Sequence, residues 1–244
     1  MSMFGNSYQQ PVPLDYGRST DALVIARFFN SVYAWMAAGL AVTAGVAWWT
    51  STQPQVLRVV FGSGGARLLL VIALFAMVWA ISGTVQRIGP TGATILFMLF
   101  SAVNGLVLSG ILLIYAKAII ASAFLITAAM FGAMSVYGLV TRRDLTSLGA
   151  YLFMGLIGII IASVVSIFWH PTWLTVVINY VGVFIFVGLT AYDTQRLKHI
   201  ALETQNDPRL AARLSINGAL MLYLDFLNLF LFIVSILGNQ DRRR

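Results

Sequence analysis

Two acidic residues lie inside long apolar stretches of this chain, where a membrane helix would bury them. Asp193 stands near the end of the run VGVFIFVGLTAYDTQRLK, and Asp225 stands near the middle of INGALMLYLDFLNLFLFIVSIL. The chain has eight acids, and the other six lie in the expected tails and loops. A charged side chain at the centre of a membrane helix costs about 2.5–3.5 kcal/mol on insertion scales, so it marks a functional site by default. We therefore expect a scaffold that holds these two carboxyls close together.

Two carboxyls held close in a low-dielectric interior cannot both ionise cheaply, so such a pair would share one proton. A nearby arginine, which stays charged, lowers the cost of ionising either acid. Arg87, at the end of another apolar run, is expected at the same membrane surface. Protonation would then release the arginine or the helix that it holds, which makes a two-state element biased by pH. Carboxylate oxygens also suit Ca²⁺, so Asp193 and Asp225 are in addition a candidate calcium site.

A polar seam accompanies Asp225 along its run. At 100° per residue, four polar residues fall within about 80° of one another on a helical wheel: Asn217, Asp225, Asn228 and Ser235. On the preceding run, Asn179 shares a face with Asp193. A helix that is apolar except for one polar seam is expected to be central, with the seam facing other protein or a pore.

Each acid also has an ordinary structural interpretation. Asp193 could pair with Arg196, three residues along, as an ion pair at a helix end. Asp225 could be a neutral, hydrogen-bonded acid that joins helices. His170, between two tryptophans, is expected to be an interfacial residue, and His199 is expected to be a solvated loop residue.

Composition indicates a membrane protein with several spans. The chain is 59% hydrophobic and 9% charged, whereas ordinary globular chains are about 25% charged. It has no Cys, which excludes disulfides, thiolate metal sites and Cys nucleophiles. The net charge of +7 is attributed to Lys and Arg that fix cytoplasmic loops and contact anionic headgroups. We expect membrane lipid as a partner, no nucleic acid, no cofactor and no enzymatic activity.

Seven apolar runs are long enough to span a bilayer, which takes about 20 helical residues. They are expected at about 28–49, 68–86, 92–115, 118–141, 148–168, 174–195 and 214–237, with a loop between the first two. The last helix should begin earlier, with Asn206 or Asp207 as its cap and Pro208 at its first position. Residues 1–21 are expected to be a flexible polar tail, 22–240 the seven-helix domain and 241–244 a basic tail. The predicted fold class is an all-α polytopic membrane protein with its seventh helix central.

The distribution of Lys and Arg predicts which side of the membrane each end of the chain occupies. Short loops rich in these residues favour a cytoplasmic N-terminus. The final Arg242-Arg243-Arg244 argues against it, because a seventh full span would put that tail outside. A re-entrant last helix would remove the conflict.

Two motifs in the last third of the chain resemble a known family. The segment GLTAYDTQ at 188–195, followed by Arg196-Leu197-Lys198, is similar to the signature of the Bax inhibitor-one family, also called transmembrane Bax inhibitor motif proteins. LYLDFLNLF at 222–230 is similar to that family's last-helix motif. The resemblance runs from about Ala22 over nearly the whole remaining chain and favours the bacterial branch, hence a bacterial inner membrane.

The resemblance implies a pH-sensitive calcium leak channel, with six helices around a central seventh. By motif match, Asp193 and Asp225 would be the proton sensor and Arg87 its latch. Some members carry an acid in the second span near the pore, and this chain departs from them with Ala76 at about that place. Calcium would then be the transported ion rather than a cofactor. Bacterial relatives are also linked to a membrane-anchored AAA protease, so the alternative function is a non-conducting regulator of such a protease.

Other intramembrane classes fit the residues less well. An intramembrane aspartyl protease needs Gly-x-Gly-Asp at its second acid, where this chain has LYLD at 222–225. A retinal protein needs a Lys in its last helix, and a rhomboid protease needs Ser and His within the membrane. A proton-coupled transporter stays open, because a proton-sharing acid pair would also serve it.

Overall fold

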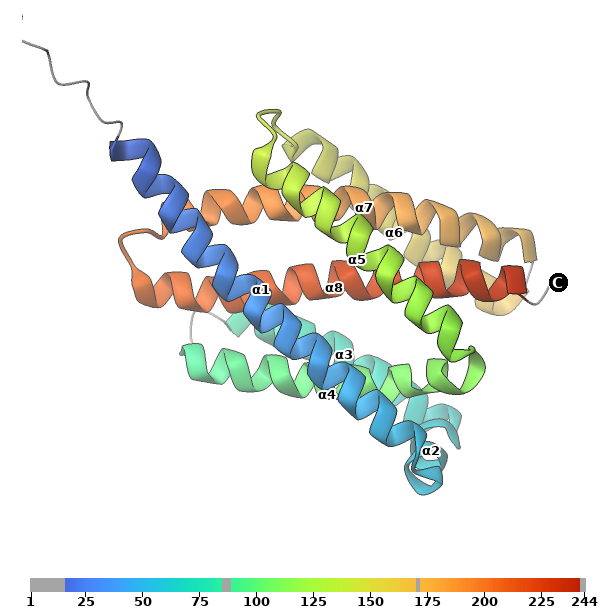
Figure 1. Cartoon of the computed structure of the whole chain (residues 1–244). Coiled ribbons are helices and arrows are strands. Elements are labelled where there is room, and N and C mark those ends of the chain that lie inside the picture. Colours follow the sequence, from blue (N-terminus) through green and yellow to red (C-terminus); the bar gives the residue numbers. More distant parts are fainter. Residues whose placement is uncertain (1–15, 85–88, 170–171, 242–244) are drawn as a thin grey trace, which may run out of the picture.

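The computed structural model describes residues 16–84, 89–169 and 172–241 as a bundle of helices joined by short connections (Figure 1). In chain order the helices are α1 (Tyr16–Ser51), α2 (Pro54–Phe61), α3 (Gly64–Thr84), α4 (Pro90–Ile114), α5 (Lys117–Val140), α6 (Thr146–Trp169), α7 (Thr172–Glu203) and α8 (Pro208–Asp241). Within the described residues, seven of these, all but α2, are long and apolar enough to cross a membrane. The predicted all-α class with seven spans is confirmed.

The start of α8 follows from its sequence. The Asp207 carboxylate accepts the backbone N–H groups of Arg209 at 3.1 Å and Leu210 at 3.0 Å. The N–H groups in the first turn of a helix have no acceptor within the helix, and the aspartate carboxylate supplies one. Pro208 fits the first position because it has no N–H to satisfy and its φ is already helical. The predicted cap is therefore confirmed, with Asp207 as the capping residue.

Three boundary predictions were wrong. Helix α1 begins at Tyr16, so residues 16–21 are helical and not part of a flexible tail, while residues 1–15 and 242–244 lie outside the described structure. Helix α7 continues to Glu203, which makes His199 a helical residue rather than a loop residue. The expected loop after α1 contains the short helix α2, with Pro54 in its first turn. Extending an existing helix costs far less than starting one, so helices continue past the end of the apolar stretch.

Helix α8 is the central element. It packs against α1, α4, α5 and α7, whereas α3 packs mainly on α4 and α6 mainly on α7 (Figure 1). Several of its large side chains are fully buried, including those of Leu222, Tyr223 and Leu229. This agrees with the central position predicted from its polar seam.

The two ends of the described chain lie on opposite faces of the bundle (Figure 1). The start of α1, the α5–α6 connection at 141–145 and the α7–α8 connection at 204–207 share one face, named here the connection face. Helix α8 then runs without a break for 34 residues, about 51 Å at 1.5 Å per residue. That length exceeds the hydrocarbon core of about 30 Å, so α8 is long enough to cross the membrane in one unbroken helix.

Glycines let α7 approach its neighbours closely. A Cβ at Gly138 on α5 would meet the carbonyl oxygen of Ala191 and would lie 3.0 Å from the Thr194 Cβ. A Cβ at Gly182 on α7 would lie 2.6 Å from the Phe232 ring of α8. Without a hydrophobic force between helices in lipid, such close backbone contact is a main source of their association.

We predict that Gly138→Ala destabilises the bundle, because its methyl group would force α5 away from the rigid backbone of α7. The expected loss is about 1–3 kcal/mol, a typical cost of overpacking. Thermal unfolding of the detergent-purified protein at one fixed scan rate measures it, with each kcal/mol lowering the midpoint by about 2–4 °C.

The matched control is Gly132→Ala on the same helix, where a Cβ would meet nothing within 4 Å. This variant should unfold at the parental temperature or slightly above it, because Ala favours a helix over Gly by up to about 1 kcal/mol. Equal midpoints for the two variants would contradict the close α5–α7 contact.

Candidate functional site

Asp193 on α7 and Asp225 on α8 meet at the interface of these two antiparallel helices. Their carboxyl groups are hydrogen-bonded to each other. Asp225 is only 4% exposed, whereas Asp193 is partly exposed. Ionised carboxylates only accept hydrogen bonds, so this bond requires a proton on one of the two acids. We call Asp193 and Asp225 the acid pair.

One oxygen of the acid pair is an open acceptor. Asp225 Oδ2 is buried and has no hydrogen-bond partner among the described residues, and the same holds for Asn217 Oδ1 two turns earlier on α8. A buried acceptor without a partner costs about 1–3 kcal/mol, so it marks a place where a donor or a cation would bind favourably. The predicted latch, Arg87, lies outside the described residues, and its contact with the acid pair therefore stays a prediction.

Arg196 lies beside the acid pair without forming the alternative ion pair. Its guanidinium acts on Asp193 electrostatically, but no ion pair within 4 Å joins the two in the described structure. The Arg196 side chain is exposed, while Asp193 turns toward Asp225. Asp193 is therefore bonded across the helix interface and not along its own helix.

The remaining residues of the predicted seam act at separate places. Asn179 Nδ2 on α7 donates to Ser235 Oγ on α8 at 2.7 Å, a second polar link between the two helices. Asn228 Nδ2 instead donates to the Leu224 carbonyl of its own helix at 2.8 Å. Residues 217 to 235 span about 27 Å of α8, so the seam follows nearly the thickness of a bilayer core.

A buried hydroxyl network that the sequence analysis missed lies beside Asp193. Tyr33 Oη on α1 and Ser135 Oγ on α5 are 2.6 Å apart, and Ser135 Oγ lies 3.0 Å from Thr194 Oγ1 on α7. Thr194 directly follows Asp193, so the network fixes the turn of α7 that carries the acid. The sequence shows that these hydroxyl side chains lie inside apolar runs, but it does not show which of them bond to one another.

A second missed group of hydroxyls lies on the other side of α8. Tyr223 Oη lies 2.6 Å from Thr43 Oγ1 of α1, and Thr43 also donates to the Ser101 carbonyl of α4 at 2.9 Å. Phe97 and Phe100 of α4 present ring edges to Tyr223. The helix that carries Asp225 is thereby held against α1 and α4 as well as α7.

The motif residues after Asp193 hold the α5–α6 connection. Gln195 Oε1 accepts the Leu145 N–H, and its Nε2 donates to the Arg143 carbonyl, both at 2.8 Å. Lys198 Nζ donates to the carbonyl of Leu139 at the end of α5 at 2.7 Å. These bonds couple α7, and with it Asp193, to a loop on the connection face.

Asp144 in this connection caps α6. Its carboxylate accepts the Thr146 backbone N–H at 2.9 Å. Hydrogen bonds from the Thr146 side chain and backbone, helped by nearby His199, hold the pKa of Asp144 below its ordinary value. Asp144 therefore stays ionised at neutral pH, unlike an acid that shares its proton.

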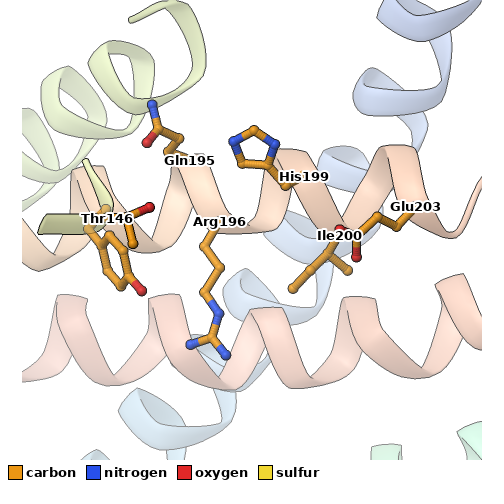
Figure 2. A pocket seen from close by; sticks show the side chains of 7 residues that line it. Thr146, Gln195, Arg196, His199, Ile200 and Glu203 are labelled. Atoms are coloured by element: carbon orange, nitrogen blue, oxygen red, sulfur yellow. The ribbon is translucent and has the colours of Figure 1, made fainter. Parts of the chain in front are cut away.

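A pocket of about 330 Å³ lies next to the acid pair, where the start of α6 meets the last turns of α7 (Figure 2). Its lining combines charged, polar and apolar side chains: Thr146, Tyr192, Gln195, Arg196, His199, Ile200 and Glu203. Arg196 belongs both to this lining and to the surroundings of Asp193. The pocket and the acid pair are thus adjacent.

The described residues do not form a closed calcium site. Nowhere in 16–84, 89–169 and 172–241 do three or more His, Cys, Asp or Glu side chains gather as a metal site. Ca²⁺ takes six to eight oxygen ligands, of which the acid pair offers a part. The pair alone would therefore supply only part of a calcium coordination shell.

Comparisons with known proteins cover nearly the same stretch as the bundle. A sequence model of the family described as "Inhibitor of apoptosis-promoting Bax1" matches residues 25–242. The inner membrane protein YbhL of Escherichia coli strain K12 is 46% identical over 215 residues, covering 87% of this chain and 92% of that protein. An uncharacterized protein of Deinococcus radiodurans is 41% identical over 217 residues, covering 89% of this chain and 92% of its own.

We predict that Gln195→Ala frees the α5–α6 connection, because both hydrogen bonds that hold it are lost. Two bonds of about 0.5–1.5 kcal/mol each, about 2 kcal/mol together, correspond to a roughly thirtyfold rise in the open population. Limited trypsin digestion reads this out, since Arg142 and Arg143 are exposed in the connection. Gln205→Ala, which changes an exposed residue of the neighbouring α7–α8 connection that makes no side-chain hydrogen bond in the described structure, should leave the cleavage rate unchanged. Parental cleavage of Gln195→Ala would show that the loop is held by other contacts.

Proposed function

Since this chain belongs to the family of membrane proteins described as inhibitors of apoptosis-promoting Bax1, we propose that it is a pH-sensitive cation leak, with Ca²⁺ as the expected ion. The observation that carries the proposal is the hydrogen-bonded acid pair between α7 and the central helix α8. An acid inside a membrane span costs free energy, so its presence there points to a functional role. A proton shared between the two acids makes the charge of the pair depend on pH.

The switch works through the charge of the acid pair. With one shared proton the pair carries a single negative charge, which attracts the guanidinium of Arg87. A second proton neutralises the pair and releases the arginine, so the helices that it held become free to separate. The leak therefore opens as pH falls. A cation that enters would bind the ionised carboxyl oxygens, among them the open acceptor Asp225 Oδ2, in competition with protons.

The proposed location is a bacterial inner membrane, by analogy with the Escherichia coli relative that is named an inner membrane protein. The connection face would be cytoplasmic, because loop-side Lys and Arg mark that side. It carries five basic residues in or near its connections: Arg142, Arg143, Arg196, Lys198 and Arg209. Arg58 and Lys117 lie toward the opposite face. This orientation puts the N-terminus in the cytoplasm and the C-terminus outside.

We predict that Asp225→Asn removes the pH dependence of calcium flux. In the parent, flux into proteoliposomes should rise as pH falls, by at most about tenfold per pH unit for each proton bound. The variant keeps the shape of the side chain but cannot share the proton in the same way. Fluorescence of a calcium dye trapped in the vesicles, read between pH 5.5 and 8, measures the flux.

The matched control is Asp144→Asn, an acid outside the pair at a helix cap where Asn serves about as well as Asp. It should retain the parental pH profile. A parental profile in Asp225→Asn would overturn the acid pair as the sensor, and absence of flux in every form would overturn the leak and favour the regulator.

A regulator of a membrane-anchored AAA protease is the second candidate function. Helix α1 is 36 residues long, about 54 Å, and its first turns project beyond the bundle (Figure 1). Leu23 in this projection is 59% exposed, and Asp21 and Arg27 are exposed beside it. A projecting helix with an exposed apolar residue provides a surface for a protein partner.

We predict that deletion of residues 1–21 separates the two functions. It removes the first turns of α1 but leaves 30 of its residues, so the bundle and its flux should persist. Turnover of a membrane substrate by the co-reconstituted protease should lose its dependence on this protein. Unchanged modulation would show that residues 1–21 are not the docking segment.

A further inference from the structure

The pocket beside Arg196 lies at the level of lipid headgroups. Helix α6 begins at Thr146 and has 24 residues, about 36 Å, so its two ends reach the two boundaries of a bilayer core of about 30 Å. Tyr137 and Tyr151 are 44% and 71% exposed near the pocket end, and Trp169 and Trp173 are exposed at the other. Exposed aromatic residues at both ends mark the two membrane interfaces. The pocket therefore opens where phospholipid headgroups are found.

The charges of the pocket come from one face of α7. Tyr192, Arg196, His199 and Glu203 follow the spacing that aligns side chains along a helix, and Ile200 lies between the last two. Arg196 and Glu203 are two turns apart and nearly in line. Figure 2 shows Arg196 extending toward α8, with Thr146 to one side of it and Ile200 and Glu203 to the other.

The charged ends in this pocket have no bonded partner in the described protein, although the Arg196 guanidinium also acts electrostatically on Asp193. In the described structure, no hydrogen bond or ion pair engages the Arg196 guanidinium or the Glu203 carboxylate, although both line the same cavity. The volume of about 330 Å³ lies within the range of small-molecule sites. The cavity thus offers a cation and an anion to one ligand.

We propose that this pocket binds the headgroup of a zwitterionic aminophospholipid. Arg196 holds the phosphate, as a guanidinium does in forked hydrogen bonds. Glu203 accepts N–H bonds from the ammonium, which a two-carbon linker keeps close to the phosphate. The lipid chains leave along the exposed start of α6, where Leu148 is 43% and Tyr151 is 71% exposed.

The balance of charge favours this ligand over an anionic lipid. A purely anionic headgroup would meet Glu203 as a like charge, which disfavours binding, whereas a zwitterion pairs both charges of the pocket. A trimethylated headgroup has the same charges but no N–H to donate to Glu203. The pocket should therefore distinguish an ammonium from its trimethylated form.

Lipid binding by the full chain tests the proposal. The delipidated protein in detergent is titrated with short-chain phosphatidylethanolamine, phosphatidylcholine and phosphatidylglycerol that carry identical acyl chains, and binding is read by native mass spectrometry. Free glycerophosphoethanolamine, which lacks the acyl chains, distinguishes a soluble headgroup from a lipid. The variants are Arg196→Gln and Glu203→Gln. The control is Arg209→Gln, because Arg209 is an exposed arginine of the connection face that does not line the pocket.

The parent should bind phosphatidylethanolamine at least about tenfold more tightly than phosphatidylcholine, the lower end of what one hydrogen bond to a charged group contributes. Glu203→Gln should bring this ratio close to one, and Arg196→Gln should weaken both lipids by about tenfold. Arg209→Gln should bind as the parent does, and the free headgroup should bind more weakly than the lipid.

Three results would overturn the assignment: equal binding of the two zwitterionic lipids by the parent, tighter binding of phosphatidylglycerol, or parental binding in both pocket variants. Arg196 and Glu203 lie at the surface, and circular dichroism checks that their variants keep the helical fold. Because the readout is lipid binding, its failure is separate from failure of the calcium-flux experiment.

Discussion

The hydrogen bond between Asp193 and Asp225 is the interaction on which the rest of this structure depends. Two carboxylates repel each other in an interior with little water, so they meet only if they hold a proton between them. The surrounding helices keep them at that distance. Helix α8 is packed on four neighbours, and α7 lies close to α5 because Gly138 leaves room for its backbone. A bundle with looser packing would let the two acids separate and ionise independently.

Five consecutive residues of α7 connect this bond to the rest of the molecule. Asp193 faces α8, Thr194 joins the hydroxyl network with α1 and α5, and Gln195 holds the α5–α6 connection. Arg196 turns to the pocket, and Leu197 is fully buried. Successive side chains on a helix point about 100° apart, so a short segment reaches several neighbours at once. Residues 193–197 of α7 therefore link the acid pair, the connection face and the pocket within one short helical segment.

Much of the fold could be predicted because its signals are local. Apolar runs of about 20 residues identify the spans, and Asp207 with Pro208 identifies the start of α8. The errors have local causes too. Residues 16–21 and His199 are polar and were predicted to be outside helices, but a membrane helix does not end where its apolar part ends. Helix α2 was missed because eight residues that begin with a proline carry too weak a pattern to distinguish a helix from a loop.

The sequence by itself determined that the chain has seven membrane helices, that α8 carries a polar seam and that two acids lie within the last two spans, because hydrophobicity and helical period are properties of neighbouring residues. Only the tertiary structure decided that Asp193 bonds to Asp225 instead of pairing with Arg196, and that Asn179 joins Ser235 while Asn228 bonds to its own helix. It also decided which hydroxyls meet in the Tyr33, Ser135 and Thr194 network. These hydrogen-bond partners depend on which faces of distant helices touch. The absence of a side chain at glycines such as Gly138 and Gly182 lets those faces come close together.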